Sequence, residues 1–124
     1  QSHGLGAARR VYSMPPAHGA LLAGRVLTDP ELRASWETEL AQICGRMIAL
    51  RTQLSTKLSE KTNQDFSFIA SEKGMFSFLG LSVEQAQGLR KDPGIYMLDS
   101  SRINVAALND RNMDVVVEAV ASVL

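Results

Sequence analysis

The feature that most constrains this fold is a long series of apolar residues spaced three and four positions apart. The series runs from residue 30 to about residue 60, and its spacing predicts one amphipathic α-helix. A start signal precedes it: Thr28 or Asp29 can cap the helix, a proline stands in the first turn, and Glu31 has the capping-box spacing. The apolar residues are Leu32, Trp36, Leu40, Ile43, Met47, Leu50, Leu54 and Leu58.

This helix would be longer than the domain that a chain of this size can form. At 1.5 Å per residue it would extend about 46 Å. A compact body of 124 residues is only about 35 Å across. We therefore expect the helix to overhang its own domain, where it either packs along something absent from this chain or pairs with another copy.

Short elements surround the long helix. A short helix is predicted over residues 20–27, after a proline-containing loop. Ser82 and Gln85 have the spacing of a capping box and predict a helix up to Arg90, which Pro93 would end. Asn109 is predicted to cap a final helix. Residues 66–70, 75–79, 96–99 and 102–107 have β-propensity and predict strands.

The order of these elements predicts an α+β fold. We expect a small antiparallel or mixed sheet with helices on one side and one long overhanging helix.

Composition excludes several classes of function. Lys+Arg and Asp+Glu both number 13, so no positive excess favours nucleic acid as a partner. Cys44 is the single cysteine, which fits a reducing compartment, and isolated His3 and His18 offer no metal site. The most apolar stretch, residues 115–124, contains Glu118 and is shorter than the ~20 residues of a membrane span.

Three motifs, in this order and spacing, carry a family resemblance. They are RRVYSMPPAHG at residues 9–19, GMFSFLGLS at residues 74–82 and SRINVAALN at residues 101–109. Together they resemble the class I aminotransferases of aspartate and aromatic amino acids, which depend on pyridoxal 5'-phosphate. The resemblance covers nearly everything from Arg9 to Leu124 and corresponds to the carboxy-terminal part of a family member.

The resemblance implies a division of the chain. Residues 1–8 would be a remnant of cloning or a disordered start, 9–29 the tail of the large-domain segment, and 30–124 the small C-terminal domain. The overhanging helix would be an interdomain helix. The complete enzyme is expected to be a cytoplasmic homodimer that moves amino groups between aspartate or aromatic amino acids and 2-oxoglutarate.

The resemblance also assigns three substrate-binding residues. Arg102 would bind the substrate α-carboxylate, a role that suits the two parallel donors of a guanidinium, although it could simply lie on the polar face of a strand. Arg9 would reach the partner subunit's active site and pair with the distal carboxylate of a dicarboxylic substrate; otherwise it is a solvated arginine near a frayed end. Phe76 aligns with an aromatic residue near the substrate pocket, or is ordinary strand core.

The residues that hold the cofactor are not expected in this chain. Its four lysines, Lys57, Lys61, Lys73 and Lys91, lie in sequence unlike the family's serine-rich lysine motif. We therefore expect no catalytic or cofactor-binding residue, no bound cofactor and no activity of the chain alone. Ser101 stands where the family usually has glycine, and a positive φ there would strain a serine.

A different class of function stays open. The chain could be an autonomous helix-mediated interaction or dimerisation module without catalysis, because the apolar steps of the long helix form a narrow seam suited to pairing. Gly45, in mid-helix, weighs against this, since glycine weakens an isolated helix by about 1 kcal/mol relative to alanine.

Overall fold

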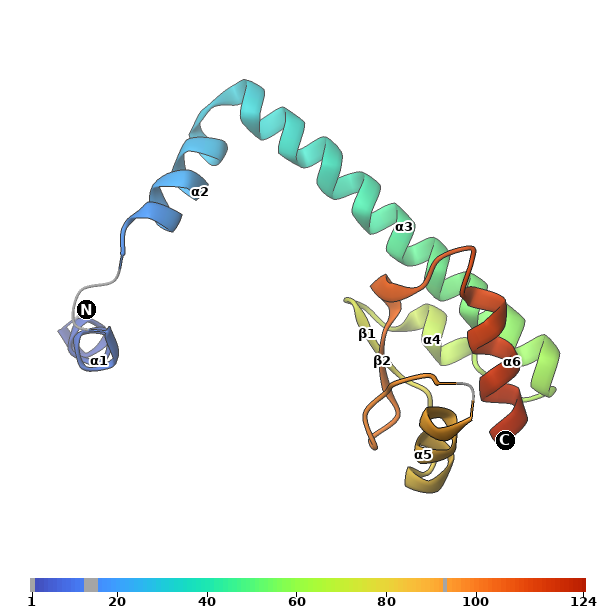
Figure 1. Cartoon of the computed structure of the whole chain (residues 1–124). Coiled ribbons are helices and arrows are strands. Elements are labelled where there is room, and N and C mark those ends of the chain that lie inside the picture. Colours follow the sequence, from blue (N-terminus) through green and yellow to red (C-terminus); the bar gives the residue numbers. More distant parts are fainter. Residues whose placement is uncertain (1, 13–15, 93) are drawn as a thin grey trace. The chain divides into compact units, whose positions relative to one another are not determined.

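The computed structural model describes residues 2–12, 16–92 and 94–124. The chain divides into two compact units, Gln1–Ala41 and Gln42–Leu124. The first contains helix α1 (Ser2–Tyr12), helix α2 (His18–Thr28) and the beginning of the long helix (Figure 1). Residues 2–8, which we expected to be a remnant of cloning or a disordered start, lie in α1. Residues 13–15 of the first motif lie outside the described residues.

The predicted long helix is confirmed as α3 (Pro30–Thr62), a continuous helix of 33 residues. Its cap is Asp29, whose Oδ1 accepts hydrogen bonds from the backbone N–H groups of Glu31 at 3.1 Å and Leu32 at 3.3 Å. The Thr28 hydroxyl instead donates back into α2. These bonds satisfy N–H groups that the first turn of a helix leaves without partners.

The apolar face of α3 is buried only toward its C-terminal end. Leu54 and Leu58 are fully buried in the core of the second unit. Trp36, by contrast, is 43% exposed. We expected the helix to overhang its domain and to pack along something absent from this chain or to pair with another copy. The exposed part has large apolar residues available for such packing: Leu32, Trp36, Leu40 and Ile43.

The second unit is an α+β fold in which helices predominate (Figure 1). Within its described residues, the sheet has two antiparallel strands, β1 (Phe76–Phe78) and β2 (Arg102–Asn104). Helices α4 (Ser67–Ser71), α5 (Val83–Lys91) and α6 (Met113–Val123) and the end of α3 supply most of the core. The predicted α+β class is right, although the sheet is smaller than the four expected strands implied.

Two of the four predicted strands are wrong. Residues 66–70 fall largely in α4, where Asp65 Oδ1 accepts a hydrogen bond from the Ser67 N–H at 2.8 Å and starts a helical turn. Residues 96–99 form no strand, because they run into a turn that the Ser101 N–H closes onto the Leu98 carbonyl at 2.8 Å.

The other two predicted strands are confirmed, one of them only in part. Residues 75–79 contain β1, whereas the segment 102–107 is a strand only as far as Asn104. The Asn104 side chain then accepts a hydrogen bond from the Ala106 N–H and begins a 3₁₀ turn, η1 (Val105–Ala107). A side-chain oxygen that competes for backbone donors in this way ends regular strand pairing.

The predicted helices are confirmed, with one shifted start. Ser82 and Gln85 form the complete capping box of α5, with bonds of 3.2 and 2.8 Å. Helix α6 begins at Met113, later than Asn109 suggested, because the Asn109 side chain accepts from the N–H groups of Arg111 and Asn112 in the preceding turn. Pro93 lies outside the described residues.

The helices within these residue ranges do not combine the length and apolarity needed to cross a membrane. The same part of the chain has no cluster of His, Cys, Asp and Glu suited to a metal ion.

Candidate functional site

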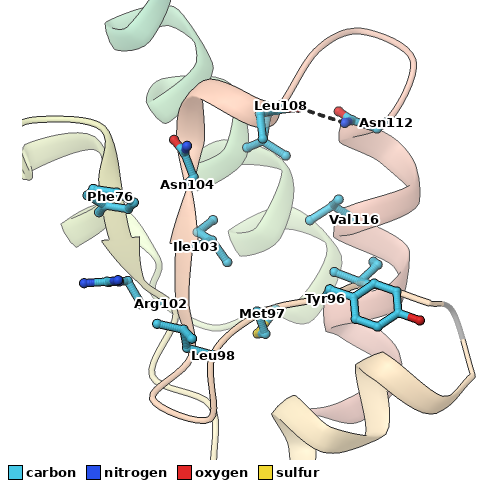
Figure 2. A pocket seen from close by; sticks show the side chains of 12 residues that line it. Phe76, Tyr96, Met97, Leu98, Arg102, Ile103, Asn104, Leu108, Asn112 and Val116 are labelled. Atoms are coloured by element: carbon cyan, nitrogen blue, oxygen red, sulfur yellow. Dashed lines mark hydrogen bonds between the residues drawn. The ribbon is translucent and has the colours of Figure 1, made fainter.

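The exposed face of the β1–β2 sheet brings a cation and aromatic rings together. Strand pairing aligns Phe76 with Asn104 and Phe78 with Arg102, so these four side chains share one face. The Arg102 guanidinium carbon lies 4.8 Å from the centroid of the Phe76 ring. Figure 2 shows the two side chains next to each other across the strands. This distance is within the range of a cation–π interaction.

The Arg102 guanidinium is available to bind an anion. It is exposed, and none of the ion pairs within the described residues includes it. A guanidinium presents two parallel N–H donors that match a carboxylate. Arg102 can therefore accept a bidentate carboxylate on the side that the Phe76 ring leaves open.

A cavity of about 520 Å³ lies beside this pair (Figure 2). Phe76 of β1 and Arg102 of β2 form one wall of the cavity, and the loop 95–98 forms another. Leu108, which precedes α6, and Val116, in α6, also line it. The lining is mostly apolar. A carboxylate bound to Arg102 would thus stand at the edge of a space suited to an apolar group.

Ser101, immediately before Arg102, has the positive φ that the family's glycine suggested. Its φ is 60°, it is 2% exposed, and its hydroxyl oxygen accepts the Gly80 N–H at 3.1 Å. A left-handed conformation costs a non-glycine residue about 1–2 kcal/mol. The hydrogen bond to a buried serine offsets part of that strain, which explains how serine is accommodated here.

A buried arginine that the sequence analysis missed holds the β1 strand in place. Arg51, on α3, is 3% exposed and donates to the carbonyls of Ile69 at 3.0 Å and Gly74 at 2.9 Å, and also to that of Phe76. It pairs with Glu72 at 3.3 Å. The available signal was its position: it falls on the apolar face of the predicted helix.

The Glu72 carboxylate extends this network to the strand itself. It accepts a hydrogen bond from the hydroxyl of Ser77, the buried residue of β1. Arg51 and Glu72 together therefore fix the backbone and the inner face of the strand whose outer face carries Phe76.

Of the predicted substrate-binding residues, Arg102 and Phe76 are brought together. Arg9 lies in the last turn of α1, in the first unit, and is exposed.

The lysines lie away from this cavity, since none is among its lining residues. Lys57 and Lys61 form surface ion pairs with Asp114 at 2.6 Å and Glu118 at 2.7 Å. The hydrogen bond and charge of Asp114 raise the pKa of Lys57. A raised pKa is the opposite of what a nucleophilic lysine needs.

Comparison with known proteins places the chain in a family. The sequence model described as "Aminotransferase class I and II" matches residues 2–120. The chain belongs to this aminotransferase family. The matched range includes residues 2–8, which precede the first motif.

Curated aminotransferases are similar along nearly the whole chain. The aromatic-amino-acid aminotransferase of Paracoccus denitrificans is 44% identical over 116 residues, which are 93% of this chain and 29% of that protein. The aspartate aminotransferase of Escherichia coli (strain K12) is 44% identical over 119 residues, 95% of this chain and 30% of its own length. The chain thus spans less than a third of these aminotransferases.

Solved aminotransferase structures share its fold. One is the aromatic-amino-acid aminotransferase from Burkholderia pseudomallei, covalently bound to pyridoxal phosphate, with a TM-score of 0.88 and 48% identity over 94% of this chain and 29% of that one. Another is a mitochondrial aspartate aminotransferase from Trypanosoma brucei, with a TM-score of 0.86 and 36% identity over 93% of this chain and 30% of its own.

Proposed function

We propose that this chain is the carboxy-terminal part of a pyridoxal-phosphate-dependent aminotransferase. Residues 9–29 would be the tail of the large-domain segment and residues 30–124 the small domain. The complete enzyme would move amino groups between aspartate or aromatic amino acids and 2-oxoglutarate. The names of the relatives, aromatic-amino-acid and aspartate aminotransferases, support this choice of substrates.

The observation that carries the proposal is the guanidinium of Arg102, which lies beside Phe76 and forms no ion pair with any residue that the structure describes. In this proposal Arg102 binds the substrate α-carboxylate with two parallel hydrogen bonds, which fix both its position and its angle. Phe76 covers one side of the guanidinium and lines the adjacent cavity. The pair would orient the amino acid so that its Cα–H points at a base outside this chain.

The residues beside Arg102 do not fit a covalently held cofactor, because the cavity lining includes no lysine. When bound, pyridoxal phosphate supplies the electron sink that stabilises a carbanion at the substrate Cα. We infer that the groups holding it belong to another part of the enzyme, and that this chain alone neither binds the cofactor nor transaminates.

Arg9 has a separate role in the proposal. It would enter the active site of the partner subunit and pair with the distal carboxylate of a dicarboxylic substrate. Its exposure and its place at the C-terminal turn of α1 suit a side chain that reaches outward. A buried carboxylate without a counter-charge is costly, so a homodimer would be needed for full activity toward aspartate.

The test uses the full-length enzyme with pyridoxal phosphate bound. Arg102→Ala is expected to lower kcat/KM for aspartate and for an aromatic amino acid by at least about a hundredfold, since a charge-assisted bidentate contact contributes about 3 kcal/mol. Arg46→Ala, an exposed arginine on α3, is the matched control and should leave kcat/KM unchanged. Equal kinetics for Arg102→Ala and the wild type would refute the assignment.

A second candidate function is helix-mediated association, which the exposed apolar residues of α3, such as Trp36, favour. The two functions are distinguished by the gene. If its upstream reading frame encodes no cofactor domain, the interaction module is the better explanation. Light scattering of the isolated chain adds a direct measurement, because association through α3 should be lost in Trp36→Glu.

A further inference from the structure

We propose that Ser101 is a positioning residue for Arg102. Its buried hydroxyl holds the end of the β1–β2 sheet in the conformation that directs the guanidinium toward a substrate carboxylate. The inference rests on the proposed function of Arg102 as the ligand of the α-carboxylate.

The evidence begins with the hydrogen bonds of Ser101. Its N–H donates to the Leu98 carbonyl at 2.8 Å, and its carbonyl accepts the Leu79 N–H at 3.1 Å. Its hydroxyl oxygen accepts the Gly80 N–H, also at 3.1 Å. Ser101 is therefore hydrogen-bonded through its backbone to the preceding turn, and through its backbone and side chain to Leu79 and Gly80, which directly follow β1.

The place of these bonds connects them to Arg102. The two bonds from Leu79 and Gly80 lie directly beyond the Phe78–Arg102 pair, which is the last pair of the sheet. The φ of Ser101 sets the direction in which the chain enters β2, and at 60° it is a conformation that serine adopts only when its surroundings hold it. The hydroxyl bond is such a constraint.

Removing the hydroxyl should therefore change the direction of Arg102. An alanine has the same energetic cost at positive φ but leaves the Gly80 N–H without its acceptor, so the turn would relax toward negative φ. A glycine would also lose the acceptor but adopts positive φ freely. The family's usual glycine at this position thus achieves the same backbone path without the additional tie that this chain has.

The experiment compares variants of the full-length holoenzyme by calorimetric binding of 3-phenylpropionate and of its neutral analogue, 3-phenylpropionamide. Ser101→Ala is expected to weaken binding of the carboxylate by about tenfold, and Ser101→Gly by about threefold, while the amide binds all forms alike. If Ser101→Ala fails to fold, the Ser101→Gly result decides on its own.

The matched control is Ser55→Ala. Ser55 is a buried serine of the same unit, 7% exposed, whose hydroxyl donates to the Phe66 carbonyl at 3.0 Å, far along the chain from β2. Its loss should lower Tm by a comparable amount and leave the affinity for 3-phenylpropionate unchanged. If it weakens carboxylate binding as much as Ser101→Ala does, the role of Ser101 is merely structural and the inference is overturned.

Arg102→Ala separates the inference from the function on which it rests. If Arg102→Ala loses the carboxylate but both Ser101 variants bind it like the wild type, only the positioning role fails. If Arg102→Ala binds 3-phenylpropionate like the wild type, the assignment of Arg102 fails, and the role of Ser101 fails with it.

Discussion

The guanidinium carbon of Arg102 lies 4.8 Å from the centre of the Phe76 ring, across the two strands of the sheet. The strand register produces this contact: Phe76 pairs with Asn104, so its ring is the diagonal neighbour of Arg102 on the exposed face. The ring shields one side of the guanidinium from water. An incoming anion is thereby limited to the other side.

Replacing Phe76 with leucine should weaken carboxylate binding without abolishing it. An exposed cation–π contact contributes about 0.5–1 kcal/mol, which corresponds to about a twofold to fivefold rise in Kd. Calorimetry with a monocarboxylate inhibitor of the full-length enzyme measures this change. Phe78→Leu is the control, because Phe78 is on the same face at similar exposure, 52% against 46%, and makes no cation–π contact among the described residues. A Kd that rises equally in both variants would contradict the role of the ring.

Arg51→Ala should be among the most destabilising single substitutions in the second unit. It removes the donors from three carbonyls and leaves Glu72 without its cation, so we expect a loss of about 3 kcal/mol or more. Urea unfolding of the full-length protein measures the loss. Arg46→Ala, on an exposed position of the same helix, should change stability by less than about 0.5 kcal/mol. Similar midpoints for the two variants would show that the buried network contributes little.

Ser82→Ala should weaken the start of helix α5 by about 1 kcal/mol, the usual effect of losing an N-cap side chain. The substitution removes the acceptor for the Gln85 N–H at 3.2 Å, while the reciprocal bond, donated by the backbone N–H of residue 82 to Gln85 Oε1, remains. Hydrogen exchange is the appropriate measurement, and protection should fall first at the amide of Gln85. Unchanged exchange at that amide would argue against the cap.

Acid should destabilise the turn before α4 through Asp65. The hydroxyl and the backbone N–H of Ser67 hold the pKa of this carboxyl below its ordinary value of 3.8. A depressed pKa in the folded state means that the stabilisation is present above pH 3.8 and is lost as the pH falls through the folded pKa. Unfolding measured across this range should show a shallower acid dependence in Asp65→Asn. A steeper or identical dependence would be inconsistent with this role.

Local signals predicted the helices well and the strands poorly. The capping box at Ser82 and the three-and-four spacing of α3 depend only on nearby residues, and both were correct. Residues 66–70 and 96–99 have β-propensity but no strand partner in the described part of the chain, and propensity over so short a segment is easily overridden. The decisive local feature at the first of these was the Asp65 carboxylate, which accepts a hydrogen bond from the Ser67 N–H where the helical turn begins.

The candidate site was predictable only where a motif marked it. The motifs singled out Arg102, Phe76 and Ser101, which stands where the family usually has glycine. Sequence spacing could not predict that Arg102 and Phe76 are in contact, because that contact depends on the strand register. Arg51 carried no motif. Its position on an apolar helix face was a signal, because a buried charge needs partners. Those partners include the carbonyls of Gly74 and Phe76, which are distant in the sequence and are found only in the folded structure.

The buried guanidinium of Arg51 has a mechanical consequence. Sliding the end of α3 by one turn, about 5.4 Å, would break every hydrogen bond that Arg51 makes to the backbone of residues 69–76. This part of α3 and strand β1 therefore move as a single rigid piece. A displacement of the helix would carry the Phe76 ring with it, so the shape of the anion site depends on the position of a helix that is not among the residues lining the cavity.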